Sequence, residues 1–140
     1  MKQTFYGDSP QVKEWLSTKF AQAPGMRAHS TLTLADGDRI CGAVWLENYN
    51  GSSVFAHVAG DGPGWLTRRF AQDVFRYVFD VLGCKKMIGI VRSSNTAAQS
   101  FDEGLGFKRE AEILDADPDG SVFIYSLKRE DCKFLRGRNG

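Results

Sequence analysis

Three glycines within five residues directly precede a predicted helix whose first turn carries two arginines. Glycines at such a turn let backbone N–H groups approach a ligand closely, and the partial positive charge at a helix N-terminus favours an anion. A threonine at the helix start is a common cap, and the two guanidinium groups add positive charge. The sequence therefore predicts a site for a phosphate-bearing ligand, for which the alternative is a plain turn followed by solvated arginines. The candidate residues are Gly60, Gly62, Gly64, Thr67, Arg68 and Arg69.

Two apolar strands flank this turn and helix. The spacing predicts a strand at residues 54–59, a helix at 67–82 and a second strand at 86–91, and Gly83 is expected to end the helix. Two strands joined by a helix lie parallel, with a right-handed crossover. The helix carries a wide apolar face, so we expect it to lie flat on a sheet. The residues of its central apolar stripe are Phe70, Val74, Val78 and Val81.

Turn and cap residues divide the rest of the chain. Ser9 followed by Pro10 is typical of a helix start. Residues 35–38 and 50–51 are typical of tight turns between antiparallel strands. In chain order, these signals predict a strand at 4–6, a helix at 10–21, strands at 29–34 and 39–47, a short helix opening at residue 95, and strands at 108–114 and 121–127 joined by a loop at 115–120.

The composition is that of an ordinary globular protein. Its 140 residues are enough for one domain, which we expect to span 1–135 with a frayed tail at 136–140. A formal net charge of +1 argues against nucleic acid or an anionic membrane surface as a partner. The spacing of Cys41, Cys84 and Cys132 fits neither a disulfide framework nor a zinc site, and no signal peptide or membrane span is evident. We therefore expect a cytoplasmic protein without a metal site.

A more specific pattern follows the second parallel strand. Asn95 and Ala98 form an Asn-x-x-Ala motif, and Phe107 ends a Leu-Gly-Phe motif twelve residues after the asparagine. Together with the order of elements, this pattern resembles the GNAT superfamily of acetyl-CoA-dependent N-acetyltransferases, and residues 125–135 are similar to small acetyltransferases of bacterial viruses. The resemblance implies a mixed α/β (α+β) fold, with a mostly antiparallel seven-stranded sheet, a central splayed parallel pair and flanking helices.

For the cofactor, the resemblance implies a cleft where the parallel strands splay apart. The pantetheine arm of acetyl-CoA would pair with the edge of the first parallel strand at Val58, and the pyrophosphate would lie on the N-terminus of the helix that follows. Asn95 and Ser100 would face the cofactor from the short helix. The glycine turn departs from the family's usual Gln/Arg-x-x-Gly-x-Gly/Ala pattern, and Pro63 removes one N–H donor.

The chemistry implied by the resemblance is direct attack of an amine on the thioester. A lysine-type amine has a reference pKa of about 10.4, so it must first lose a proton. His57 and Glu47 are the candidate bases, with Tyr49 as a further candidate, acting directly or through water. A backbone N–H near Val58 would stabilise the oxyanion where the strand bulges.

The leaving thiolate needs no strong acid but can use one. Many relatives carry a tyrosine seven residues after the asparagine, where it protonates the thiolate, and this chain has Asp102 at that position. A thiol pKa of about 8.5 already makes the thiolate a fair leaving group. The candidates for the acid are Asp102, Ser100 and water.

Simpler roles are open for the same residues. Asn95 is suited to capping a helix, His57 to a hydrogen-bonded place in the core, and Glu47 to a solvated strand end. For the whole chain, the main alternative is a non-catalytic module that keeps the fold and binds CoA or a protein partner. A weaker alternative is contact between the basic tail at 133–138 and nucleic acid, against which the net charge argues.

The sequence leaves the acceptor open. It could be a small-molecule or a peptide amine, and the loops at 21–27, 47–52 and 115–120 could line its site. Whether the donor carries acetyl or a longer acyl group, and whether the protein forms a homodimer, also stay open.

Overall fold

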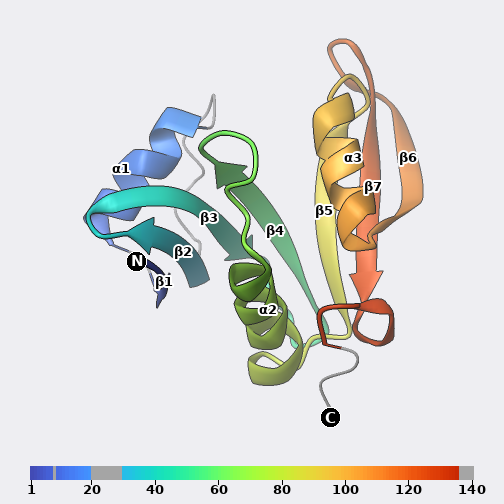
Figure 1. Ribbon diagram of the computed structural model, residues 1–140. Coiled ribbons are helices and arrows are strands. Elements are labelled where there is room, and N and C mark those ends of the chain that lie inside the picture. The colour runs from blue at the N-terminus through green and yellow to red at the C-terminus, as the bar shows by residue number, and fades with distance from the viewer. Residues whose placement is uncertain (8, 20–29, 136–140) are drawn as a thin grey trace.

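The computed structural model describes residues 1–7, 9–19 and 30–135. Its elements are β1 (Lys2–Tyr6), α1 (Pro10–Lys19), β2 (Ser30–Asp36), β3 (Arg39–Glu47), β4 (Ser53–Gly60), α2 (Arg68–Arg76), the π-helix η1 (Tyr77–Val81), β5 (Lys86–Arg92), α3 (Thr96–Leu105), β6 (Lys108–Asp117), β7 (Gly120–Lys128) and the short 3₁₀ turn η2 (Arg129–Asp131). The described strands form a seven-stranded sheet in the order β1-β2-β3-β4-β5-β7-β6 (Figure 1).

The parallel pair β4–β5 interrupts an otherwise antiparallel sheet. Its register covers only residues 53–55 of β4 and 86–88 of β5, so Phe55 and Ile88 are the last partners. Beyond them β4 continues to Gly60 and β5 to Arg92 as separate strands, and Figure 1 shows them diverging. The predicted fold, including the splayed central pair, is confirmed.

Helices cover the two faces of the sheet unequally. Helices α2 and α3 lie on one face, where Phe70, Val74 and Phe75 of α2 join the main core. Helix α1 lies on the other face, where Val12 and Leu16 pack against alternate residues of β3, Ala43 and Trp45. Each of these two helices, α2 and α1, therefore packs its apolar side against the sheet.

The predicted long helix changes its winding near its end. After Arg76 the backbone forms η1, in which the N–H of Leu82 donates to the carbonyl of Tyr77 at 2.8 Å. The guanidinium of Arg129 donates to the carbonyl of Phe79, so a group outside the helix satisfies part of this wider turn. The expected place of Val81 in the apolar stripe is wrong, because the changed winding leaves this side chain 69% exposed.

The predicted loop at 115–120 is also wrong in extent. Strands β6 and β7 continue to Asp117 and Gly120, so only Pro118 and Asp119 separate them. Asp115 takes a left-handed conformation (φ 59°), and the pairing shifts register between Ile113 and Asp117. A bulge therefore absorbs the residues that the sequence assigned to a loop.

The three cysteines lie in the interior of the protein. Cys41, Cys84 and Cys132 are buried and unbonded, as expected. No helix among the described residues is long and apolar enough to cross a bilayer. The expected end of the first helix at residue 21, the loop at 21–27 and the tail at 136–140 lie outside the described residues.

Candidate active site

The diverging strands create a cleft at the centre of the sheet. Residues 56–60 of β4 form one wall, and residues 89–91 of β5 form the other. The first turns of α3 add Asn95, Phe101 and Asp102, and the cleft has an empty volume of about 970 Å³. It therefore opens where pairing between β4 and β5 stops.

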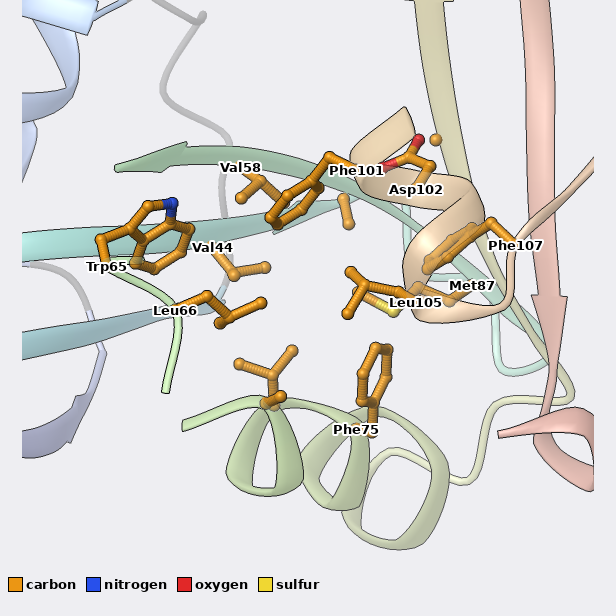
Figure 2. A pocket seen from close by; sticks show the side chains of 14 residues that line it. Val44, Val58, Trp65, Leu66, Phe75, Met87, Phe101, Asp102, Leu105 and Phe107 are labelled. Atoms are coloured by element: carbon orange, nitrogen blue, oxygen red, sulfur yellow. The ribbon is translucent and has the colours of Figure 1, made fainter. Parts of the chain in front are cut away.

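On the α2–α3 face the cleft continues into an apolar pocket of about 490 Å³. Figure 2 shows Val58, Leu66, Phe75 and Leu105 directed into it from the sheet, the β4–α2 turn and both helices. Such a lining suits an apolar or amphipathic chain rather than a charged group.

Trp65 forms part of the wall in both spaces. Its indole ring lies across Gly42 and Gly60, where an added Cβ would come within 2.1 Å of the ring. The ring also stacks on Phe101 of α3, with centroids 6.4 Å apart and planes inclined by 15°. Gly60 therefore leaves the space that the indole ring of Trp65 occupies. The sequence alone did not lead us to this role. The signal was present, because a large aromatic residue stands inside a turn rich in glycine.

On the opposite face of β4, the structure brings together the two predicted bases. His57 Nε2 lies 2.7 Å from Glu47 Oε1, and both side chains are partly buried. His57 pairs across the strands with Trp45, whose ring centroid lies 4.9 Å from the imidazole. Tyr49 does not join them, because its hydroxyl donates to the carbonyl of Leu82 at 2.7 Å.

Asp102 lies on the α2–α3 face, against β5. A Cβ at Gly89 would stand 3.2 Å from its Oδ2, so the glycine leaves room for the carboxyl group. Burial, together with a smaller effect of the nearby charge of Glu103, raises the pKa of Asp102 from 3.8 to about 6. A carboxyl group with this pKa exchanges protons near neutral pH, so it could act as an acid.

Of the two cofactor contacts predicted for α3, the structure places only Asn95 at the cleft. Asn95 caps the helix, its Oδ1 accepting the N–H of Ala98 at 3.0 Å, and it also lines the cleft. Ser100 is exposed and does not line the cleft, so the structure does not bring it to the other candidates.

The glycine turn has the backbone that its sequence predicts. Gly62 and Gly64 have φ of 80° and 75°, a region that favours glycine. Thr67 caps α2, its hydroxyl accepting the N–H of Phe70 at 3.1 Å.

The two arginines diverge from the helix start. The guanidinium of Arg68 lies over the ring of Phe134, 5.7 Å from its centroid. Arg69 is 82% exposed, and its Nε lies 3.4 Å from Asp73 Oδ1. Neither arginine lines the cleft, and their contact with a phosphate stays a prediction.

No protein-family model and no curated protein matches the sequence, whereas solved structures match the fold. Mutant forms of the spermidine/spermine N-acetyltransferase SpeG from Vibrio cholerae have a TM-score of 0.73 at 15% identity, over 93% of this chain and 96% of theirs. Another mutant of that enzyme has a TM-score of 0.66 at 21% identity, over 94% of this chain and 79% of that one. The protein yncA from Salmonella typhimurium, solved with its cofactor acetyl-CoA, has a TM-score of 0.72 at 11% identity, over 91% of this chain and 94% of that one.

The chain has the GNAT acetyltransferase fold. In this GNAT fold, the sheet separates two groups of candidate residues. Val58, Trp65 and Asp102 line the pocket on the α2–α3 face. The pair of His57 and Glu47 lies on the α1 face, because side chains alternate along β4. The gap between β4 and β5 connects the two groups.

Proposed function

We propose that this protein is an N-acetyltransferase that transfers the acetyl group of acetyl-CoA to a primary amine within a ternary complex. One observation carries the proposal. The gap between β4 and β5 has an apolar pocket on one face and the His57–Glu47 pair on the other. The likeness to SpeG and to yncA, which was solved with acetyl-CoA, adds support.

The free edge of β4 suits the pantetheine arm. Beyond Phe55, β4 keeps its pairing with β3 but has lost its pairing with β5. A strand edge with unpaired N–H and C=O groups binds an extended chain that carries amides, and pantetheine carries two. Its apolar segments would contact Val58, Trp65 and Phe101, and the pyrophosphate would lie at the start of α2 beside Arg68.

On the α1 face, His57 would accept the proton of the attacking amine. If Nε2–H donates to Glu47, the basic lone pair is on Nδ1, and the carboxylate orients the ring and stabilises the imidazolium that forms. The amine nitrogen then forms a bond to the carbonyl carbon, and a backbone N–H of β4 near Val58 stabilises the oxyanion.

On the α2–α3 face, the carbon–sulfur bond breaks and CoA leaves as a thiolate. Asp102 lines this side, and with a pKa of about 6 about one molecule in ten carries the proton at neutral pH. The proposed acid and base thus act from opposite faces of the sheet. Donor and acceptor would approach the gap from different sides, which is the geometry that a ternary complex needs.

Titration of acetyl-CoA into the protein by calorimetry tests the cofactor site. We expect micromolar binding that weakens in the Arg68→Ala/Arg69→Ala double variant, because charge near the pyrophosphate is lost. Lys13→Ala/Lys108→Ala removes the same charge from exposed positions of α1 and β6 and serves as the control. Absence of binding by the wild-type protein would contradict the proposed function.

A further inference from the structure

The face that carries His57 and Glu47 continues across β5 and β7. The register places Phe55 beside Ile88, and Ile88 opposite Ser126 of β7, so these side chains share one face. Helix α3 lies on the opposite face, where Asp102 meets Gly89. Among the described residues, no helix covers this part of the α1 face.

An apolar strip runs along this uncovered surface. Ile90 of β5 pairs with Ile124 of β7, and Val122 of β7 pairs with Ile113 of β6. Ile90 is 51% exposed and Ile113 is 50% exposed. Val122 and Ile124 between them are partly exposed, and branched apolar side chains that reach the surface on three neighbouring strands are typical of a binding surface.

A row of lysines borders the strip at the start of β5. Lys86 of β5 stands directly opposite Lys128 of β7, and Lys108 of β6 stands opposite Ser126. Like charges directly opposite on neighbouring strands destabilise a sheet. Lys86 is partly neutralised by Glu110, 2.7 Å from its Nζ, whereas Lys128 has no ion pair among the described side chains.

A groove with an empty volume of about 1070 Å³ lies at this row. Lys85, Lys86 and Lys128 line it together with two acidic residues, Glu110 and Glu130. Since Glu110 already pairs with Lys86, the remaining charge of the groove is positive and complements an anionic group.

Resting on the proposed function, we infer that the acceptor is the N-terminus of a peptide with apolar residues followed by an acidic one. The amine would lie at His57 and the acidic group at the lysine row. The apolar side chains would lie on Ile90, Ile124 and Ile88, which the register places between the gap and that row. Along β5, Ile90 at the gap is four residues from Lys86, about 13 Å at the rise of a strand. An extended peptide covers this distance in about four residues.

The charge of the lysine row and the pKa of an α-amine both favour a peptide N-terminus as the acceptor. An α-amine has a pKa of about 7.7–8.0, so histidine deprotonates it far more readily than a lysine amine at about 10.4. A polyamine such as spermidine would instead bring positive charge to the lysine row, which repels it.

Thiol release from acetyl-CoA measures the acceptor preference. The probes are the amidated peptides Ala-Ile-Val-Glu-Glu and Ala-Ile-Val-Gln-Gln, with spermidine as the third acceptor. We expect kcat/KM to be about two- to fivefold higher for the glutamate peptide, which is the effect of a partly exposed charge pair. Lys108→Ala/Lys128→Ala should abolish this difference, whereas Lys2→Ala/Lys13→Ala should preserve it.

Three results would overturn the inference: equal rates for the two peptides, a preference for spermidine, or a difference that survives in the Lys108→Ala/Lys128→Ala variant. Transfer to none of the three acceptors by a protein that binds acetyl-CoA would also overturn it. Calorimetry with acetyl-CoA alone separates these results from failure of the proposed function, which would appear as absence of cofactor binding.

Discussion

Replacing Asp102 with asparagine is expected to stabilise the folded protein at neutral pH while slowing acetyl transfer. Burial between α3 and β5, with a smaller effect from Glu103, raises the pKa of this carboxyl from 3.8 to about 6. Its ionisation therefore costs more free energy in the folded protein than in the unfolded chain. Asparagine keeps the shape of the side chain and carries no charge.

The magnitude follows from the linkage between protonation and folding. The difference between 3.8 and about 6 corresponds to about 3 kcal/mol for a carboxyl fully shielded from water. Because water reaches part of this side chain, we expect a gain of about 1–2 kcal/mol at pH 7. Between about pH 4 and pH 6 the Asp102 carboxyl binds more protons in the folded protein than in the unfolded chain, so its contribution to the free energy of unfolding falls as pH rises. The gain from Asp102→Asn is therefore small at the lower pH and complete above the higher one.

Urea denaturation of the wild type and of Asp102→Asn at about pH 4 and about pH 7 measures the gain in the free energy of unfolding at each pH. Glu112→Gln removes a carboxylate from the exposed part of β6 and is the control. A variant Asp102→Asn that is no more stable than the wild type at neutral pH would refute the reasoning, and so would equal stabilisation at both pH values.

Two further predictions concern the turn and helix on the cofactor side. Gly60→Ala should displace the indole of Trp65, because the new Cβ would come within 2.1 Å of it. We expect a shift in tryptophan fluorescence and a loss of about 1–3 kcal/mol in urea denaturation, whereas Gly104→Ala, which meets no neighbour, should cost nothing. Unchanged fluorescence and stability in Gly60→Ala would contradict this seat for the ring. Thr67→Ala should lower the free energy of unfolding by about 1 kcal/mol, because the N–H of Phe70 loses its acceptor, and Thr67→Ser should restore it. Failure of serine to restore stability would argue against the cap.

The sequence predicted most of the fold because local signals determine it. Thr67 and Asn95 cap helices as expected, and Gly83 ends its helix with φ of 70°. The strands on either side of the predicted tight turns pair antiparallel. The contact between His57 and Glu47 could also have been foreseen, since a hairpin with a turn near residues 50–51 places them on one face.

What the sequence did not predict depends on tertiary contacts. The position of the Trp65 ring depends on the space left by Gly42 and Gly60, which lie on different strands. Its stacking partner Phe101 is far away in the chain. The divergence of Arg68 and Arg69 likewise depends on Phe134 and Asp73, which no local pattern connects to the glycine turn. The π-helical winding after Arg76 and the bulge in β6 are further features that local propensity does not determine.

The measurement that tests the central claim most directly is thiol release from acetyl-CoA in the presence of amines. We expect release of CoA in equal amount to acetylated amine. In His57→Ala, kcat should fall by about 100-fold, which is typical for loss of a general base. Glu47→Gln should also lower kcat, because the carboxylate that orients the imidazole and stabilises its charge is lost. Binding of acetyl-CoA should stay within about twofold, because both side chains lie on the α1 face of the sheet, opposite the pocket. Tight binding of acetyl-CoA without transfer to any amine, or transfer that both variants retain, would contradict the account.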